Sequence, residues 1–262
     1  MNIEKQNLPL ILLTNDDGIQ AKGLEWLIEI VKPFGKIIVV APEKAQSGMS
    51  NAITIHTPVR ATFVNEKDNI KFYSCNGTPV DCIKLGLHQL LDTKPDFIVS
   101  GINHGSNASI SIIYSGTMGA VIEGCINGIP SIGFSLSDYS KVADFKAAAH
   151  FGRKIFQKIL NHGLPKYTCL NVNVPKVQIE DIKGIKVCRQ AKGAWKEEYD
   201  KRIDPQNGVY YWLTGDFDNF EPDADDTDEW ALRNNYVSIV PISIDFTSYT
   251  AIEYLKKITN EI

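Results

Sequence analysis

The sequence predicts an α/β fold, a Rossmann-like and mostly parallel sheet with helices on both faces. In the first half of the chain, short apolar runs alternate with stretches of helical periodicity, which is the element order of a parallel α/β sheet. These runs are apolar on both sides, as strands buried on both faces are. In the second half, strand-like runs at hairpin-like spacing predict an antiparallel β-hairpin extension. We therefore assign residues 1–140 to the core and residues 141–262 to the remaining core elements plus the extension, within one structural domain overall.

The first half contains predicted strands joined by predicted helices. Continuous apolar runs predict buried strands, and alternating runs predict edge strands. Pro33 ends the first helix, which covers 24–34. Thr78, followed by Pro79 and then Asp81, forms a capping box at the start of the second helix, and the third helix begins near Ser115. The predicted strands are LILLT ending at Thr14, 36–42, 53–64, 71–75, 96–102 and 129–136.

The second half is predicted to begin with a long amphipathic helix over 143–160. The acidic segment 215–230 lies between the last two predicted strands and offers carboxylates that suit calcium. It lacks the glycine and the distal glutamate of an EF-hand loop, so we predict a solvated loop. The predicted strands of this half are 167–175, 185–190, 209–213 and 236–244.

Composition excludes several kinds of partner. The net charge is -4 and no cluster of Lys or Arg is present, so neither a nucleic-acid polymer nor a membrane surface is an expected partner. The apolar runs are far shorter than a membrane span, and the first residues lack the features of a signal peptide. The five cysteines include no C-x-x-C pair, which favours buried, reduced thiols in a cytoplasmic protein.

Two adjacent aspartates, Asp16 and Asp17, follow the first apolar run directly. They would lie at the carboxyl end of a buried strand, the edge of an open α/β sheet where ligands bind. Two ionised carboxylates this close repel, and burial increases the cost. A divalent cation removes the conflict, and oxygen ligands favour Mg²⁺, Mn²⁺ or Ca²⁺ over zinc. The sequence N-D-D-G is also a common turn in which aspartate caps a helix, so this motif alone leaves both interpretations open.

Three later loops favour a ligand site at the same edge. One is rich in small and hydroxyl residues after the second strand, and another carries Asn103 and Asn107 among glycines. Glycine lets backbone N–H groups approach an anion, and asparagine offers a donor and an acceptor. Ser115, Gly116 and Thr117 stand at a helix start, where free N–H groups and the helix dipole favour an anion. A phosphate beside a metal predicts phosphoester hydrolysis by metal-activated water.

Seven blocks of the sequence occur in one order between about residue 10 and residue 242: LLTNDDGIQAKGL, QSGMSNAIT, NGTPVDCIKLG, PDFIVSGINHGSN, IYSGTMGAVIEG, LNVNVP and YVSIVPI. In this combination the chain resembles the SurE survival-protein family of metal-dependent nucleoside monophosphate phosphatases. The resemblance implies a Rossmann-like fold whose C-terminal hairpin and terminal helix are exchanged between subunits of a homodimer or homotetramer. It implies 5′-nucleotidase activity, with 3′-nucleotides and short polyphosphate as further substrates. The metal ligands it implies are Asp16, Asp17, Ser47 and Asn103.

Two positions depart from the family pattern. Gln46 stands where the family usually has an arginine, and Ala108 stands where it usually has a glycine. The first change removes a cation beside the phosphate site and bears on substrate preference. The second bears on the stiffness of the loop. Neither position is an implied metal ligand.

The sequence therefore predicts a cytoplasmic 5′-nucleotidase with one Mg²⁺ or Mn²⁺ per subunit. Asp16 and Asp17 are the predicted catalytic residues, and one of them orients or deprotonates the attacking water. His104 is a candidate leaving-group acid, although a histidine next to a ligand is more often incidental. The predicted phosphate contacts are Asn15, Asn107, Ser115, Gly116 and Thr117. The candidate base-stacking aromatics are Tyr114, Trp195, Tyr199 and Trp212, for which packing is the commoner use.

Two other classes of protein fit parts of the pattern. A non-catalytic receiver-like regulatory module also binds Mg²⁺ through two acids after its first strand. It needs a third aspartate and a lysine at later strand ends, where this chain has SGIN and FSLSD. A haloacid-dehalogenase phosphatase spaces its acids as D-x-D, and here they are adjacent.

Overall fold

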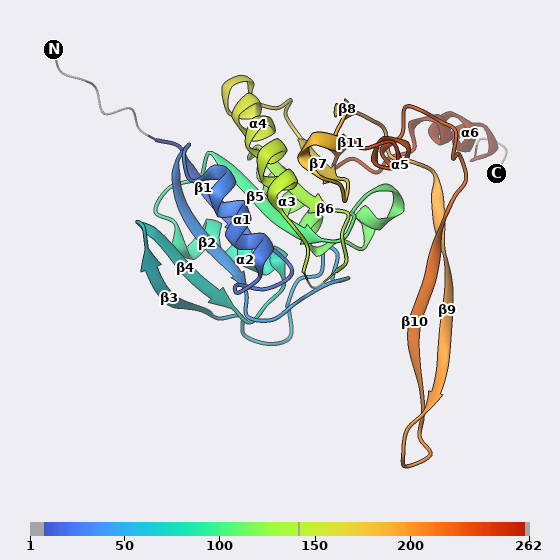
Figure 1. Cartoon of the computed structure of the whole chain (residues 1–262), viewed down its shortest axis with the longest axis horizontal. Coiled ribbons are helices and arrows are strands. Elements are labelled where there is room, and N and C mark those ends of the chain that lie inside the picture. Colours follow the sequence, from blue (N-terminus) through green and yellow to red (C-terminus); the bar gives the residue numbers. More distant parts are fainter. Residues whose placement is uncertain (1–7, 141, 260–262) are drawn as a thin grey trace.

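The computed structural model describes residues 8–140 and 142–259. Its central feature is a nine-stranded sheet in the order β3-β4-β2-β1-β5-β6-β7-β11-β8, and β9 and β10 form a separate two-stranded hairpin (Figure 1). The strands are β1 (Leu10–Thr14), β2 (Lys36–Pro42), β3 (Ala61–Lys67), β4 (Ile70–Cys75), β5 (Phe97–His104), β6 (Ser131–Leu136), β7 (Thr168–Val174), β8 (Gly184–Val187), β9 (Gly193–Ile203), β10 (Val209–Asn219) and β11 (Tyr236–Ser243). The helices are α1 (Lys22–Val31), α2 (Pro79–Leu85), α3 (Gly116–Ile126), α4 (Lys146–His162), α5 (Asp228–Arg233) and α6 (Tyr249–Thr259), and the short helical turns are η1 (Gly86–Leu90), η2 (Ser109–Ile113) and η3 (Ile179–Asp181).

The middle of the sheet is parallel, from β4 through β2, β1, β5 and β6 to β7. Two outer pairings are antiparallel, namely β3 with β4 and β11 with β7. The parallel α/β class with helices on both faces is thus confirmed. Strands β7, β11 and β8, from the second half of the chain, continue the sheet built by the first half.

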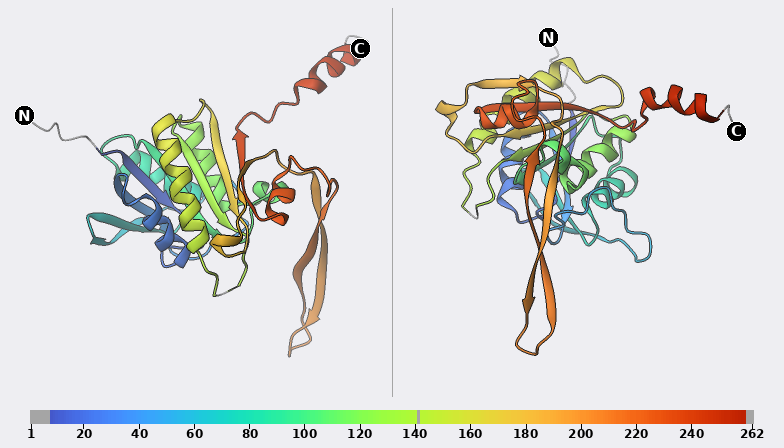
Figure 2. Two further views of the ribbon diagram at one scale, coloured as in Figure 1. Left: turned by 45° about the horizontal axis from the view of Figure 1, so that its top comes forward. Right: turned by 90° about the vertical axis from the view of Figure 1, so that its right-hand side faces the viewer.

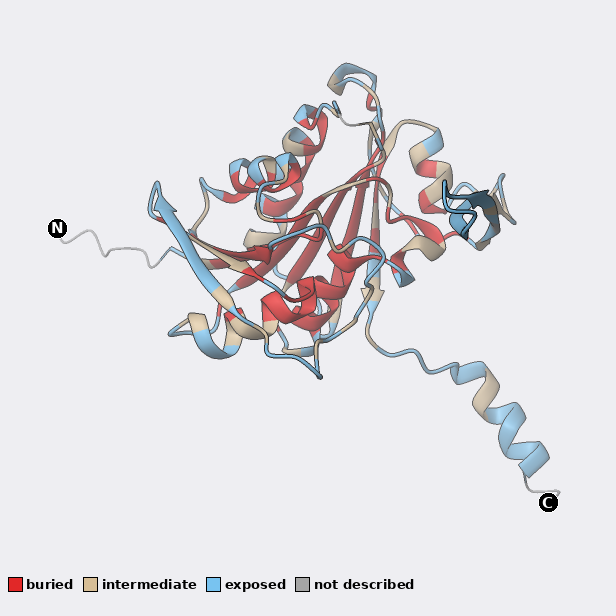
Figure 3. Ribbon diagram, turned by 90° about the horizontal axis from the view of Figure 1, so that it is seen from below, coloured by how far each residue is buried: buried red, intermediate tan, exposed pale blue. Residues whose placement is uncertain are grey.

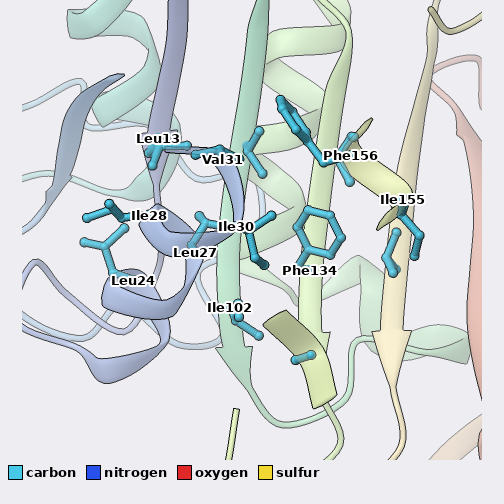
Figure 4. Close-up of a cluster of buried hydrophobic side chains, with 14 of the residues drawn as sticks. Leu13, Leu24, Leu27, Ile28, Ile30, Val31, Ile102, Phe134, Ile155 and Phe156 are labelled. Atoms are coloured by element: carbon cyan, nitrogen blue, oxygen red, sulfur yellow. The ribbon is translucent and has the colours of Figure 1, made fainter. Parts of the chain in front are cut away.

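Helices α1 and α4 cover one face of the sheet. Leu27 of α1 and Phe156 of α4 pack with Leu13 of β1 and Phe134 of β6 in one buried cluster (Figure 4). The other face is covered by α2 and α3, where Ile83 and Ala120 pack with sheet residues such as Leu12. Burial of apolar area on both faces is the main stabilising term for such a sheet. It fixes the strands whose carboxyl ends form the site.

The predicted capping box of α2 is present, and α3 also has a side-chain cap. The side chain of Thr78 accepts a hydrogen bond from the backbone N–H of Asp81 at 3.1 Å, and the Asp81 carboxylate accepts one from the N–H of Thr78 at 2.9 Å. This reciprocal pair satisfies two N–H groups that the helix itself leaves without acceptors. Ser115 caps α3 by accepting from the N–H of Met118 at 3.0 Å.

Two elements extend away from the sheet. The β9–β10 hairpin projects from the body as a long arm, and α6 projects separately near the C-terminus (Figure 2). Both are mostly exposed, whereas the central strands are buried (Figure 3). No residue of α6 is buried. We call β9, β10 and α6 together the projecting arms.

Three expectations for individual elements were wrong. Residues 53–60 are not a strand, and β3 begins only at Ala61. The N–H and the hydroxyl of Thr54 donate to the carboxylate of Asp81, and these bonds replace strand pairing at Thr54. The acidic segment is not all loop: its first five residues complete β10, and α5 begins at Asp228. The expected strand over 185–190 is shorter, as β8 covers Gly184–Val187.

The sequence pattern does not predict β9 as a strand. Its residues include alternating charges, and only pairing with β10 over eleven positions makes it a strand. Among the described residues, no helix combines the length and the apolar character needed to cross a membrane.

Candidate active site

The two aspartates lie where the parallel strands end. Pairing of Thr14 with Ser100 sets the end of β1 beside the middle of β5, so the residues after Thr14 reach the last residues of β5. The carboxylate of Asp17 accepts a hydrogen bond from the backbone N–H of His104 at 3.2 Å. The predicted meeting of the Asp16–Asp17 turn with the loop carrying Asn103 is therefore present in the structure.

Asp16 is held on several sides. Its side chain is buried, with 3% of the residue exposed. The hydroxyl of Thr117 donates to its carboxylate at 2.5 Å, and its backbone carbonyl accepts from the N–H of Gln46 at 2.7 Å. Gly116 packs so closely that a Cβ there would lie 2.9 Å from the Asp16 Cβ. The start of α3 and the loop after β2 are thus both in contact with the first aspartate.

The electrostatics of the pair favour a cation. Burial raises the pKa of Asp16 to about 6, with a further increase from the neighbouring charge of Asp17. Burial also raises the pKa of Asp17. Each effect reflects the cost of a buried negative charge, and a divalent cation offsets that cost directly. We refer to Asp16, Asp17, Ser47 and Asn103, together with the start of α3, as the aspartate site.

The donor set fits a hard divalent ion. Asp16, Ser47 and Asn103 line a common cavity, with Asp17 next to Asp16 in the turn. The amide nitrogen of Asn103 donates to the carbonyl of Gly105 at 2.8 Å, which leaves its Oδ1 as the atom to face an ion. Two carboxylates, a hydroxyl and an amide oxygen are the ligand types of Mg²⁺ and Mn²⁺. Outside this mixed set, the described part of the chain holds no group of three or more His, Cys, Asp or Glu suited to a metal.

Asn107 is built into a buried network from β7. Its N–H donates to Oδ1 of Asn173 at 2.8 Å, its carbonyl accepts from the amide of Asn171 at 2.8 Å, and its own amide donates to Ser135 at 2.8 Å. Asn173 also donates to Asn171 at 2.9 Å. These bonds assign the LNVNVP block a role in fixing the loop that carries Asn107.

The other predicted phosphate residues lie around Asp16. Ser115 lines the cavity, and Gly116 and Thr117 form the first turn of α3 behind the carboxylate. Asn15 is buried and its amide donates to the carbonyl of Gly18 at 2.8 Å, so that its side chain braces the turn. Its Oδ1 is buried with no partner among the described residues. Asn15 is not among the residues that line the cavity.

The cavity at the aspartate site has a volume of about 560 Å³. Two of the four candidate aromatics, Tyr114 and Trp195, line it, and Tyr199 and Trp212 do not. Ser106, in the predicted loop between Asn103 and Asn107, also lines the cavity. So do Tyr139 and the β10 segment 213–215, which no local pattern marks because they reach the cavity only through the fold. A larger hollow between α1 and β3–β4, about 750 Å³, contains none of the predicted site residues.

Comparison with known proteins gives one consistent result. The family profile described as "Survival protein SurE" matches residues 11–197. Proteins named 5′-nucleotidase SurE from Phocaeicola vulgatus and Christiangramia forsetii are 49% and 53% identical to the chain, covering 96% and 94% of it and 97% and 95% of their own lengths. The crystal structure of the SurE protein from Aquifex aeolicus superposes with a TM-score of 0.82 at 39% identity, covering 96% of this chain and all of the other.

Proposed function

The chain belongs to the SurE survival-protein family and is a 5′-nucleotidase, and we propose that it hydrolyses nucleoside 5′-monophosphates at the aspartate site with one Mg²⁺ or Mn²⁺ per subunit. The observation that carries the proposal is the buried Asp16 beside Asp17, contacted by the start of a helix suited to an anion. Nucleoside 3′-monophosphates and short polyphosphate present the same terminal phosphoryl group, and we include them in the proposed substrate range.

Binding of the phosphate is assigned to the first turn of α3. The N–H groups of Gly116 and Thr117 stand at the helix start, where no acceptor within the helix is available. They and the positive end of the helix dipole favour a phosphate. The Thr117 hydroxyl is already donated to Asp16, so its contribution to the phosphate is through the backbone. Asn107 keeps its loop in place through its bonds to β7.

The aspartates orient the water that attacks phosphorus. A carboxylate oxygen of Asp16 or Asp17 accepts a proton from that water, a role suited to a group with a raised pKa. The water oxygen bonds to phosphorus as the P–O bond to the nucleoside oxygen breaks, and the proton taken up by the aspartate passes to that oxygen, which gives a nucleoside and inorganic phosphate. Asp16, Asp17, Ser47 and Asn103 would hold the ion, which when bound supplies charge neutralisation at the phosphoryl oxygens and a more acidic water.

The decisive test is a panel of nucleotides and polyphosphates assayed against several divalent metals, with chelated enzyme as the control. We expect hydrolysis of nucleoside 5′-monophosphates, restored to the chelated enzyme by Mn²⁺ or Mg²⁺. Full activity in excess chelator would exclude the metal. Covalent trapping of radiolabelled phosphate on the protein would exclude direct attack by water. Turnover without any phosphodonor distinguishes the enzyme from a receiver-like module.

The projecting arms support the proposal of a homodimer or homotetramer. Many of their large apolar side chains are exposed, and extensive exposed apolar surface marks an interaction site. On the hairpin, Trp212 is 62% exposed. A second copy that covered these faces would bury them, and light scattering measures the resulting mass. The apolar residues of the projecting arms that are more than half exposed include Tyr199, Ile203, Tyr211, Trp212, Leu213, Tyr249, Tyr254 and Leu255.

We also propose that the enzyme acts in the cytoplasm, with no membrane and no nucleic-acid polymer as partner. All five cysteines are buried free thiols, as is usual where reducing systems keep thiols unpaired. Fractionation of cells and detection of the protein in the soluble or the membrane fraction tests this placement.

A further inference from the structure

We propose that Asp81 and Thr78, the two residues of the α2 capping box, are positioning residues for the metal ion, because they hold the loop that carries Ser47. The inference rests on the proposed function and extends it, since it assigns the placement of a metal ligand to side chains outside the cavity. Neither Asp81 nor Thr78 lines that cavity. We call residues 43–55, which follow β2, the serine loop.

The serine loop has little apolar packing to hold it. No residue from 43 to 55 is buried, and the side chains of Met49, Ile53 and Ile55 are exposed. A segment with few buried apolar contacts opens locally at a low cost in free energy. The conformation of the loop therefore depends on its hydrogen bonds to neighbouring elements.

Hydrogen bonds hold the serine loop on both sides of its metal ligand. Before the ligand, the N–H of Gln46 donates to the backbone carbonyl of Asp16 at 2.7 Å. After it, the N–H of Ser50 donates to the carbonyl of Tyr114 at 3.1 Å, and the Ser50 hydroxyl donates to the carbonyl of Ile113 at 2.5 Å. These bonds fix the first part of the loop, and its last part contacts the start of α2.

Each residue of the capping box bonds both to the helix and to the loop. The hydroxyl of Thr78 accepts from the N–H of Asp81 at 3.1 Å and donates to the carbonyl of Ala52 at 2.7 Å. The carboxylate of Asp81 accepts from the N–H of Thr78 at 2.9 Å. It also accepts from the N–H and the hydroxyl of Thr54, at 3.1 Å and 2.6 Å. The cap that starts α2 therefore also closes the serine loop.

Burial strengthens the attachment to Asp81. Both Asp81 and Thr78 are only 5% exposed, and hydrogen bonds to a charged acceptor stabilise more than bonds between neutral groups. A Cβ added at Gly77 would lie 2.5 Å from Oδ2 of Asp81, so the glycine leaves room for the carboxylate. Release of Thr54 would leave a buried carboxylate with fewer donors, which is costly.

Helix α3 limits the serine loop on another side. A Cβ added at Gly119 would lie 2.2 Å from the carbonyl oxygen of Ser50, so the helix approaches the backbone of the loop too closely for a side chain there. The loop is thus held between the start of α2 and the first turns of α3. The same packing therefore sets the positions of Ser47 and of the helix start that we assign to the phosphate.

Thr54→Val tests the loop side of this arrangement alone, because Asp81→Asn would also weaken the cap of α2. The change removes the hydroxyl that donates to Asp81 and keeps the β-branched shape. We expect the dissociation constant for Mn²⁺, measured by calorimetric titration of the metal-depleted protein, to rise roughly 10-fold. Thr54→Ser retains the hydroxyl and should bind Mn²⁺ nearly as the wild type does. Thr57→Val, at an exposed threonine just after the loop, is the matched control and should leave Mn²⁺ binding unchanged.

Hydrogen exchange of the metal-free protein measures the loop directly. Thr54→Val should accelerate exchange over residues 47–54 and leave α2 near the wild-type rate, because the bonds between Thr78 and Asp81 remain. Exchange over 47–54 at the wild-type rate would overturn the proposal.

Ser47→Ala completes a double-mutant cycle. If the loop acts through its serine, Thr54→Val should weaken Mn²⁺ binding little further once Ser47 is alanine. An equal loss in both backgrounds would overturn the proposal, as would no loss in the wild-type background.

The Mn²⁺ titration also separates this inference from the proposed reaction. If the wild type binds Mn²⁺ but hydrolyses no nucleotide, and Thr54→Val weakens binding, the reaction fails and the positioning role stands. If nucleotides are hydrolysed and Thr54→Val matches the wild type in Mn²⁺ affinity, the positioning role fails and the reaction stands. A wild-type protein that binds no divalent cation would overturn both.

Discussion

The aspartate site and the projecting arms depart in opposite ways from the usual distribution of residues. At the site, Asp16 and Asn173 are polar side chains buried in the body. In the arms, Trp212 and Tyr254 are apolar side chains exposed to solvent. Burying a polar group costs free energy unless it has a hydrogen-bond partner, and exposing apolar surface to water is also unfavourable. Asp16 and Asn173 have hydrogen-bond partners within the chain, whereas the arms have apolar surface that another molecule can cover.

This contrast separates two kinds of sensitivity. Substitution at the site should change the chemistry of a chain that still folds, because the apolar clusters on either face of the sheet are untouched. Substitution in the arms should change assembly and leave the folding of one chain nearly unaltered.

The largest effect is expected for Asp17→Asn. The change removes one of the two charges that attract the cation and keeps the size of the side chain. We expect kcat/KM for AMP to fall roughly 1,000-fold with added Mn²⁺, with the thermal unfolding midpoint close to that of the wild type. Asp68→Asn is the control, as Asp68 is an exposed aspartate paired with Lys32 at 2.8 Å. An Asp17→Asn enzyme of wild-type rate would refute the metal assignment.

Thr117→Val should have the next largest effect. It deletes the hydroxyl that donates to Asp16 at 2.5 Å while preserving the shape of a β-branched side chain. A hydrogen bond to a charged group contributes about 1.5–3 kcal/mol, so we expect kcat/KM to fall roughly 10- to 100-fold. Thr117→Ser retains the hydroxyl and should keep most of the activity. Steady-state kinetics of the two variants decide the point, and equal rates in both would contradict it.

Trp212→Lys tests the projecting arms, where a substitution should change assembly and not the folding of one chain. A charge in the exposed apolar face of the hairpin should oppose its burial by a second copy. We expect light scattering to give a lower mass for the assembly, or a dissociation constant of the subunits that is higher by at least about 10-fold. Phe63→Lys, on an exposed strand aromatic outside the arms, should leave the mass unchanged. A wild-type protein that is monomeric at all accessible concentrations would count against the assembly itself.

The smallest effect concerns Glu229, next to Asp228, whose buried carboxylate accepts a hydrogen bond from the N–H of Ala191 just before the hairpin. Burial, with a smaller contribution from Asp228, raises the pKa of Glu229 to about 7. The folded state then binds the proton more tightly than the unfolded state, so this group favours folding at low pH. Its contribution is lost as the pH rises from about 5 to about 8.

Glu229→Gln should therefore raise the free energy of unfolding above that of the wild type at pH 8 and change it little at pH 5. We expect a gain on the order of 1 kcal/mol, reduced by solvent screening at this partly exposed position. Denaturant unfolding at both pH values measures it. An identical pH dependence in variant and wild type would show that Glu229 is not the group responsible.

Local patterns predicted the elements whose burial is settled by their own residues. The apolar runs at Leu10–Thr14 and Lys36–Pro42 are strands in the structure, because no other state buries both of their faces. The Thr78 capping box predicted the start of α2 because both partners lie within one turn. By contrast, residues 53–60 look like a strand and are not one, since Asp81, distant in sequence, binds Thr54.

The candidate site likewise has one part that local sequence predicts and another that depends on contacts between distant residues. Asp16 and Asp17 are adjacent in the chain, so the sequence alone brings two carboxylates together. Their contact with Thr117 depends on a separation of 101 residues, and no local pattern reports it. Tyr139 escaped prediction for the same reason, because only the packing of its ring on Gly105 brings it to the cavity.

By itself, the sequence determined the alternation of strands and helices, the cap of α2, the start of α3, and the pair of acids after the first strand. These features depend on residues within a few positions of one another, where side-chain type fixes the favourable conformation. Only the tertiary structure decided which strand ends meet, which carboxylate is buried, and which aromatic rings surround the cavity. Those outcomes depend on sheet order and on contacts between distant segments, since parallel strands are joined through long crossovers that any local pattern leaves unspecified.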